Sequence, residues 1–296
     1  MKPPPFDYVA VASTEEAIAE LDAHGDAAKL LAGGQSLLPL LNLRLAAPGR
    51  LVDLNRVGTL ASIEDREGGV TIGAMARQRA IEKSALVAAR VPLLADALPW
   101  VGHTAIRNRG TLGGSLAHAD PAAELPAVAL CLDARFTARD ARKARTIGAR
   151  EFFTGYLTTA LAPTELLTEI WFAALPPGSG AAWIEVARRH GDYALAGVAA
   201  VVVLDGDVVR EARLALTGVD AVPVRATEAE QLLAGARLTT ESMGAAAAAV
   251  RRRVEPHTDI HATAAYRRHV AGVLTVRALT RAGERATRAG ERAGRA

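Results

Sequence analysis

The sequence predicts an α+β protein with two domains, the first of them divided into two α/β subdomains. Three observations lead to this prediction. Strand-like and helix-like segments alternate over the first 176 residues. The clearest linker in the chain is Pro176–Gly180, with the sequence Pro-Pro-Gly-Ser-Gly. Beyond this linker, strand-like segments come first and helical segments follow, which indicates an antiparallel sheet with helices packed on one side.

The first subdomain is expected over residues 1–56. Ser13 and Glu16 have the spacing of a capping box, which marks the start of a helix. Short apolar runs ending in turn residues predict buried strands. The expected elements are a helix after Ser13 to about Leu21, a strand at Ala28–Ala32, a helix capped by Ser36 and reaching Leu45, and a strand at Leu51–Leu54.

The second subdomain is expected over residues 57–176. Gly68-Gly69 separates two apolar runs and predicts a hairpin. Helices broken by Pro92 and Pro99 should follow, and then a long irregular stretch from His103 to Pro121. The expected elements are strands at Ala61–Ile63 and Val70–Ile72, helices within Ala76–Trp100, a helix near Ala122–Leu132, and strands at Ala134–Ala138, Thr146–Ala149 and Leu166–Phe172.

The C-terminal domain is expected over residues 177–280. Asp205-Gly206-Asp207 joins two long apolar runs and predicts a hairpin within a three-stranded antiparallel sheet. The expected elements are strands at Ala181–Val186, Val198–Leu204 and Val208–Thr217, and helices at Ala226–Ala234, Thr240–Arg253 and Ile260–Thr280. The Arg/Ala/Gly-rich tail, 281–296, repeats every seven residues without a large apolar position, so we expect a frayed helical extension or disorder.

Composition excludes several classes of function. The net charge of +3 is the surplus of the tail, which holds five arginines and two glutamates, so the rest of the chain is neutral and nucleic-acid binding is not expected. No apolar run reaches the length of a membrane span, and no signal peptide is evident, so we expect a cytoplasmic protein. The single cysteine, Cys131, leaves no ligand set for an iron–sulfur cluster and is expected to be a small core residue.

Two glycine-rich loops are the main candidates for a binding site. The first is Ala32–Ser36, at a strand-to-helix junction, and the second is Gly110–Ser115. Glycine permits positive φ and close backbone approach, so successive N–H groups can converge on an anion, and Ser36, Thr111 and Ser115 add hydroxyl donors. The two loops together could hold a pyrophosphate. Taken singly, each loop is better explained as an ordinary tight turn, and neither matches a Walker A or a G-x-G-x-x-G motif.

Other candidates have weaker support. His257 and His261 have a metal-ligand spacing, but the first is expected to precede its helix. His118 and Asp120 lie close in sequence without a third ligand or a nucleophile. Tyr193 follows a predicted strand, and its ring could lie near a cofactor or simply cover the edge of the core.

Three segments in order resemble one known family. They are AGGQSLLP at 32–39, IRNRGTLGGSLAHADP at 106–121 and RRHGDYA at 188–194. They are similar to segments of the FAD-binding medium subunit of the xanthine dehydrogenase and carbon monoxide dehydrogenase family of molybdenum hydroxylases. The resemblance covers about residues 1–280. It implies a two-subdomain FAD-binding domain of the vanillyl-alcohol-oxidase type, followed by a three-stranded antiparallel sheet with a helical bundle.

The resemblance also implies roles for individual residues. The pyrophosphate loops would be Ala32, Gly33, Gly34, Gln35 and Ser36 together with Thr111, Leu112, Gly113, Gly114 and Ser115. Asp120 and Glu124 would contact the ribityl and ribose hydroxyls, while Leu167 and Tyr193 would lie near the flavin ring. Many relatives have a lysine at the position assigned to Ile184, so a charge that would raise the flavin potential is missing there.

The implied activity is electron relay without a catalytic residue in this chain. FAD would take electrons from a small subunit with [2Fe–2S] clusters and pass them to a quinone, NAD or oxygen. A large molybdopterin subunit would select the substrate, such as carbon monoxide, an aldehyde, a purine or an N-heterocycle. We expect a dimer of heterotrimers. The alternatives are a self-sufficient flavin oxidase or reductase, a Rossmann dehydrogenase, which lacks its fingerprint here, and a scaffold without FAD.

Overall fold

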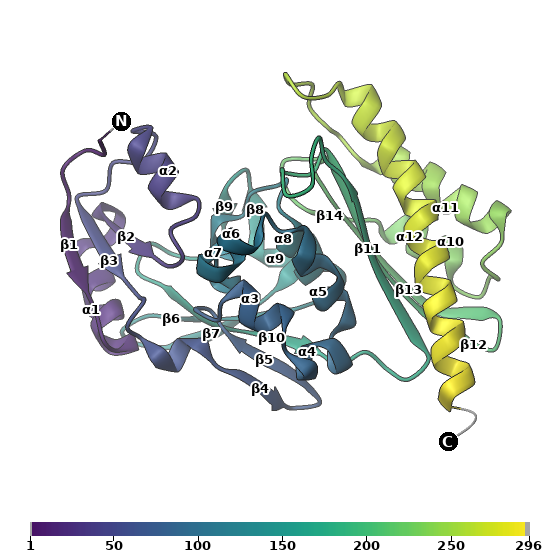
Figure 1. The fold of residues 1–296 in the computed structure, drawn as a ribbon, viewed down its shortest axis with the longest axis horizontal. Helices are drawn as coiled ribbons and strands as arrows, with labels where there is room; N and C mark the ends of the chain where they lie inside the picture. Colours follow the sequence, from purple (N-terminus) through teal and green to yellow (C-terminus); the bar gives the residue numbers. More distant parts are fainter. Residues whose placement is uncertain (1, 294–296) are drawn as a thin grey trace.

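The computed structural model describes residues 2–293, which form three consecutive parts along the long axis of the molecule (Figure 1). The first part is a small parallel sheet in the order β1-β3-β2, with one helix packed against it. Ser13 caps this helix by accepting from the Glu16 N–H, as predicted, but the Glu16 carboxylate binds the Ala12 N–H. The elements are β1 (Asp7–Ala10), α1 (Thr14–His24), β2 (Ala28–Leu31), α2 (Leu37–Asn42) and β3 (Arg50–Asp53).

Strand β1 was not predicted. It has only four residues, and two of them are exposed, so it has neither an apolar run nor a clear alternation. Its place in the sheet comes from parallel pairing with β3, which is distant in sequence.

The second part is a five-stranded sheet in the order β4-β5-β10-β6-β7, with helices packed on it. Its hairpin turns at Glu67-Gly68, both with positive φ, and Pro92 begins α5 as expected of proline at a helix start. The strands are β4 (Ile63–Arg66), β5 (Gly69–Gly73), β6 (Arg135–Arg139), β7 (Ala144–Gly148), β8 (Phe153–Gly155), β9 (Thr158–Thr159) and β10 (Leu166–Ala173). The helices are α3 (Gln78–Glu82), α4 (Ala85–Arg90), α5 (Pro92–Ala97), α6 (Thr104–Arg109), α7 (Leu112–His118), α8 (Glu124–Cys131) and α9 (Ala149–Phe152).

The prediction of an irregular stretch from His103 to Pro121 is wrong, because this segment forms α6 and α7. Glycine-rich sequence has low helix propensity, which explains the error. Two local features compensate for it. Thr111 caps α7 by accepting from the Gly114 N–H at 3.1 Å, and Gly113 packs directly on Ala74.

The third part is an antiparallel sheet in the order β11-β12-β13-β14, followed by three helices. The sheet has one strand more than predicted, because the two-residue β14 pairs with β13. The elements are β11 (Ser179–Val186), β12 (Ala196–Asp205), β13 (Val208–Thr217), β14 (Val224–Arg225), α10 (Thr227–Leu233), α11 (Thr240–Arg253) and α12 (Ala264–Ala293).

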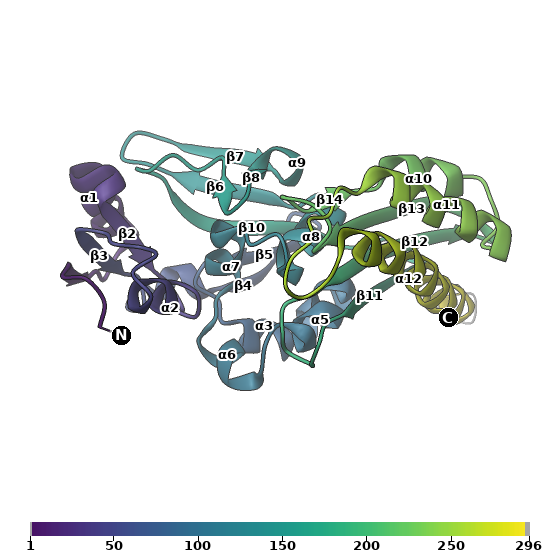
Figure 2. The ribbon, with the colours of Figure 1, turned by 90° about the horizontal axis from the view of Figure 1, so that it is seen from above.

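Both faces of this sheet are covered, as Figure 2 shows from above. Along β12, Ala199 and Val201 belong to the core shared with the second part, whereas Val198 and Ala200 belong to the core under the helices. Alternate residues of a strand face opposite sides, so covering both sides explains why eight consecutive residues of β12 are buried.

Helix α12 differs most from its prediction. It begins later than expected, at Ala264, and continues through Ala293, so most of the segment expected to fray or be disordered is regular helix. Ala282 and Ala286 are buried against β11. A Cβ atom on Gly180 would lie 1.8 Å from the Ala282 carbonyl oxygen, which shows how closely helix and strand approach. Residues 294–296 of the predicted tail lie outside the described residues.

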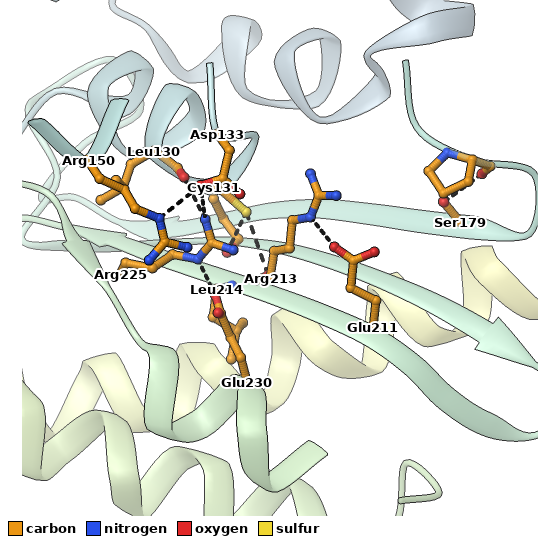
Figure 3. A network of polar contacts seen from close by, with 12 residues as sticks. Leu130, Cys131, Asp133, Arg150, Ser179, Glu211, Arg213, Leu214, Arg225 and Glu230 are labelled. Atoms are coloured by element: carbon orange, nitrogen blue, oxygen red, sulfur yellow. Dashed lines mark hydrogen bonds and ion pairs between the residues drawn. The ribbon is translucent and has the colours of Figure 1, made fainter. Parts of the chain in front are cut away.

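A network of charged groups joins the second and third parts (Figure 3). Arg225 on β14 has a buried side chain that donates to the Leu130 carbonyl oxygen at 2.8 Å and to Asp133 at 3.0 Å. It also pairs with Glu230 on α10, whose carboxylate accepts the Leu214 N–H at 2.7 Å. Cys131 lies in the same region and is fully buried, as predicted for a core residue.

None of the described helices is both long enough and apolar enough to cross a membrane.

Candidate functional site

The first glycine loop, Ala32–Ser36, connects β2 to α2. Gly34 has a φ of +77°, a conformation that favours glycine, and the Gln35 side chain donates to the Gly33 carbonyl oxygen at 3.1 Å. No acceptor among residues 2–293 takes the backbone N–H of Gly33, Gly34, Gln35 or Ser36. The Ser36 hydroxyl makes no capping bond to α2, contrary to the prediction. The loop therefore keeps adjacent donors free for a ligand.

The second loop, Thr111–Ser115, is the N-terminal turn of α7, and its backbone donors are already used. The N–H groups of Leu112 and Gly113 donate to the carbonyl oxygens of Ala76 and Ala74, and that of Gly114 donates to the Thr111 hydroxyl. The Leu112 side chain is fully buried in the core. The expectation that each loop offers a row of free N–H groups therefore holds for the first loop and not for the second.

The two loops lie against each other, which the sequence argument required. A Cβ on Gly33 would lie 2.3 Å from the Arg109 carbonyl oxygen, so these backbones are in contact. A Cβ on Gly114 would lie 3.2 Å from that of Ala32 and 2.7 Å from the Thr111 hydroxyl. Any side chain at Gly33 or Gly114 would push the loops apart or break the α7 cap.

Two polar side chains that the sequence analysis missed fix this junction. Asn55 follows β3 and donates to the Ala32 carbonyl oxygen at 3.0 Å. Arg77 donates to Asn55 at 2.6 Å and also to the Arg109 carbonyl oxygen, so it links Asn55, beside the first loop, to the residue that ends α6 just before the second loop. Nothing in the spacing of these residues indicates this role, because their contacts join the two subdomains.

Asp120 lies just beyond the end of α7. Ala119 ends this helix in the left-handed region, with a φ of +51°, an uncommon conformation for a residue other than glycine. One Asp120 oxygen accepts the Ala122 N–H at 2.9 Å, and the other is 4.0 Å from the His118 imidazole. The sharp turn therefore fixes the Asp120 carboxylate beside the second loop.

Tyr193, in the segment between β11 and β12, lies near the first loop. The residue as a whole is 58 % exposed, but its hydroxyl end lies among polar groups of the other parts. The pKa of this hydroxyl is raised by burial first and then by negative charge on Asp120, while a hydrogen bond with Ser36 opposes the shift and Glu124 adds to it. Tyr193 therefore lies near Ser36 of the first loop and within electrostatic reach of Asp120 and Glu124.

Glu124 is the first residue of α8 and is only 4 % exposed. Leu167 is 5 % exposed and belongs to the core of the second part. It precedes Thr168, whose carbonyl oxygen accepts the Ala74 N–H, and the Ala74 carbonyl oxygen accepts the N–H of Gly113. Leu167 is thus connected to the second loop through two backbone hydrogen bonds.

Ile184, where the resemblance implies a missing charge, lies on β11. Ile184 packs against the core under the helices, on the face of β11 that points away from the loops. Its neighbour Glu185 points to the opposite face, together with Trp183. The titratable residue on the opposite face of β11 is therefore Glu185, and burial raises the pKa of its carboxyl to about 7.

No group of three or more His, Cys, Asp and Glu side chains among residues 2–293 is arranged to hold a metal ion. An open groove of about 520 Å³ runs along α12, and none of the predicted site residues lines it.

Two family models together cover most of the chain. The model described as the FAD binding domain in molybdopterin dehydrogenase matches residues 4–173, and the carbon monoxide dehydrogenase flavoprotein C-terminal domain matches residues 181–282.

Individual proteins agree with the family models. The chain is 44 % identical over 288 residues to the 6-hydroxypseudooxynicotine dehydrogenase complex subunit alpha of Paenarthrobacter nicotinovorans, covering 97 % of each. It superimposes on a chain of the carbon monoxide dehydrogenase of Hydrogenophaga pseudoflava with a TM-score of 0.95 and 41 % identity, covering 96 % of this chain and 99 % of the other. Quinoline 2-oxidoreductase of Pseudomonas putida gives a TM-score of 0.92 and 37 % identity, covering 97 % and 99 %. The chain therefore belongs to the FAD-binding medium subunits of the molybdenum hydroxylases and is an oxidoreductase component.

Proposed function

We propose that this chain relays electrons through FAD from an iron–sulfur subunit to an external acceptor, as the medium subunit of a cytoplasmic molybdenum hydroxylase. The observation that carries this proposal is the junction of the two glycine loops. The first loop has adjacent free N–H groups, and the second loop, whose own N–H groups are hydrogen-bonded, packs against it and fixes its position. Backbone donors of this kind bind a pyrophosphate, the central anion of FAD.

Each residue group at the junction has a distinct task. The free N–H groups of Gly33–Ser36 and the Ser36 hydroxyl bind the pyrophosphate, and Thr111–Ser115 fixes their position and adds the Ser115 hydroxyl. Asp120 and Glu124 accept or donate hydrogen bonds at the ribityl and ribose hydroxyls. Leu167 and Tyr193 contact the flavin ring. FAD supplies the chemistry, because it exchanges electrons singly or in pairs.

The need for partner subunits follows from the metal ligands that this chain lacks. Its single cysteine is fully buried, and burial raises the pKa of the thiol to about 12, so it remains a neutral thiol in the core. A [2Fe–2S] cluster requires four ligands, chiefly cysteines. The clusters therefore belong to a small subunit, and the molybdopterin and the choice of substrate belong to a large one. We propose a dimer of these heterotrimers.

Coexpression with the cognate large and small subunits tests this proposal. We expect the three chains to copurify, with about one non-covalent FAD for each copy of this chain, and substrate to bleach the flavin absorbance of the complex. The isolated chain should bind FAD but oxidise no substrate.

Two results would contradict the electron relay. Substrate oxidation by the isolated, metal-free chain would support a self-sufficient flavoenzyme instead. A folded chain that takes up no FAD would show that the loop junction is purely structural.

A further inference from the structure

The segments that carry Tyr193 and Asp120 meet at one corner of the C-terminal domain. Tyr193 lies in the connection between β11 and β12, which ends at Leu195, and Asp120 precedes Pro121 in the connection between α7 and α8. Gly218, the residue that follows β13, contacts both connections. The separation of Tyr193 from Asp120 therefore depends on the contacts made at this corner.

Gly218 joins the two connections through its backbone. Its N–H donates to the Pro121 carbonyl oxygen at 2.8 Å. Its φ is +75°, and a Cβ atom at this position would lie 2.8 Å from the Leu195 carbonyl oxygen and 2.9 Å from that of Ala194. Glycine alone combines this conformation with so close an approach, so the end of β13 packs directly on both connections.

A buried arginine of α12 binds the same corner from the other side. Arg267 is 7 % exposed and lies near the start of the helix. Its guanidinium donates to the carbonyl oxygens of Leu195 at 2.7 Å and Gly218 at 3.2 Å, and it pairs with Asp259 at 2.7 Å. A guanidinium holds its donors in one rigid plane, so Arg267 fixes the distance between the end of the Tyr193 connection and the end of β13.

Thr217 binds the connection that carries Asp120. It ends β13 and is only 1 % exposed. Its hydroxyl oxygen is 2.7 Å from the carbonyl oxygens of both Pro121 and Ala123, and the Ala123 N–H donates to the Asp120 carbonyl oxygen at 3.0 Å. A continuous series of hydrogen bonds therefore runs from the residues that follow Tyr193 to the turn that contains Asp120.

We propose that Arg267, Gly218 and Thr217 are positioning residues that set the placement of Tyr193 and Asp120 around the bound FAD. The inference rests on the proposed function, which assigns Tyr193 to the flavin ring and Asp120 to the hydroxyls of the FAD chain. Asp120 belongs to the segment matched by the FAD-binding domain, whereas the three positioning residues belong to the C-terminal domain. The C-terminal domain thus determines the geometry of a site that lies mainly in its neighbour.

The test is the fluorescence of the flavin in the FAD-loaded chain, compared at equal FAD occupancy. A tyrosine ring in contact with flavin quenches this fluorescence, and the quenching falls steeply as the ring moves away. Thr217→Val removes the hydroxyl and keeps the shape of the side chain, while Thr217→Ser keeps the hydroxyl. The matched control is Thr275→Val, because Thr275 is equally buried and its hydroxyl donates to the Ala271 carbonyl oxygen at 2.8 Å within α12.

A second pair of variants tests the arginine. Arg267→Lys keeps the charge but loses the planar set of donors that reaches two carbonyl oxygens. Its matched control is Arg225→Lys, because Arg225 is also buried and donates to a carbonyl oxygen, that of Leu130, in the separate network of Figure 3. Urea denaturation reports how much stability each variant loses, so variants of similar stability can be compared.

We expect Tyr193→Ala to raise the emission of the bound flavin severalfold. Thr217→Val and Arg267→Lys should raise it about twofold, because a buried hydrogen bond worth ~1 kcal/mol no longer holds the connection and displaced positions of the ring become populated. Thr217→Ser and both controls should match the native chain. In a chain that already has Tyr193→Ala, Thr217→Val should cause no further rise, since the quenching ring is gone.

Unchanged emission in Thr217→Val and Arg267→Lys would overturn the inference, and so would an equal rise in the two controls, which would trace the effect to lost stability. A folded chain that takes up no FAD would refute the proposed function as well. If FAD binds and Tyr193→Ala leaves the emission unchanged, Tyr193 does not contact the flavin. The positioning role is then wrong, while binding of the pyrophosphate by the glycine loops still stands.

Discussion

The interface between the second and third parts and the junction of the glycine loops differ in how their polar groups are satisfied. At the interface, Arg225 binds Asp133, Glu230 and a carbonyl oxygen, and Asp96 binds Arg285 and the Trp183 N–H. At the junction, four successive N–H groups of the first loop have no partner within residues 2–293. One carboxylate oxygen of Glu185 likewise has no hydrogen-bond partner among the described residues.

We expect this difference to separate the residues that stabilise the fold from those that bind a ligand. Buried polar groups in folded proteins nearly always have partners, so a group that lacks one is expected where a ligand or a proton completes it. Substitutions at the interface should therefore lower stability and leave the affinity for FAD unchanged. Substitutions at the junction should lower the affinity for FAD by more than their effect on stability explains.

The largest effect on stability is expected from Arg225→Met. Methionine leaves the largely buried Glu230 carboxylate without its cation, whereas Asp133 is partly exposed and keeps its pair with Arg150. Breaking a buried ion pair on one side costs about 3–5 kcal/mol. Urea denaturation of the FAD-free chain measures this loss. Arg237→Met, which removes an exposed pair with Asp207, is the control and should cost less than about 1 kcal/mol.

Substitution of glycine in the first loop tests the other half of the comparison. Gly34→Val forces a branched residue into a φ of +77° within the row of free N–H groups. We expect the affinity for FAD to fall at least about a hundredfold, which is ~2.7 kcal/mol. Gly114→Val should have a similar effect, because its side chain would meet Thr111 and Ala32.

Gly68→Val is the matched control for backbone strain. Gly68 has a nearly equal φ of +73° and no neighbour within 4 Å of an added Cβ, and it lies in the β4–β5 turn. The Gly68→Val variant should lose about as much stability as the Gly34→Val variant, but it should keep the full affinity for FAD. Equal flavin affinity in all three variants would show that the loops are ordinary turns.

The elements with long periodic patterns could be predicted from sequence, and those that depend on distant contacts could not. Helix α11 was predicted with its observed bounds, and Thr239 caps it. Strands β1 and β14 are short and form only by pairing with distant strands. The continuation of α12 depends on packing against Gly180 and on Asp96, neither of which is visible in a tail without large apolar residues.

The candidate site shows the same limit. The loops that resemble the family were located from their motifs, and the structure brings them together. Sequence could not reveal which N–H groups are free, because the partners of Leu112 and Gly113 are backbone carbonyl oxygens of residues 76 and 74. It also could not show which face of β11 Ile184 occupies, since strand alternation determines the face only when the register is known.

The pH dependence of stability should distinguish Glu124 from Glu165. Burial raises the pKa of Glu124 to about 8, so between its ordinary value and pH 8 the folded state holds a proton that the unfolded state has lost. Glu124 therefore destabilises the fold as pH rises through this window. Glu124→Gln should gain on the order of 2 kcal/mol relative to the native chain between pH 6 and pH 8.

Glu165 should show the opposite sign. Its hydrogen bond with Arg145 lowers its pKa, so its contribution to stability is present above the ordinary value and is lost as the pH falls. Glu165→Gln should therefore be less stable than the native chain at neutral pH and approach it in acid. Urea midpoints measured across the pH range test both signs, and parallel curves for the two variants would contradict the assignment of Glu124 as a protonated group.

The smallest effect is expected at Asp96, which connects α5 to both β11 and α12. Its carboxylate accepts two hydrogen bonds from Arg285, at 2.9 and 3.0 Å, and one from the backbone N–H of Trp183 at 2.8 Å. Asp96→Asn keeps an acceptor for Trp183 and removes the charge that holds Arg285. Because both side chains are partly exposed, the cost should be about 1 kcal/mol. Hydrogen exchange should show faster opening of α12 beyond Ala282 and unchanged protection of α11, whereas exchange that rises equally throughout the chain would mean that Asp96 stabilises the fold as a whole.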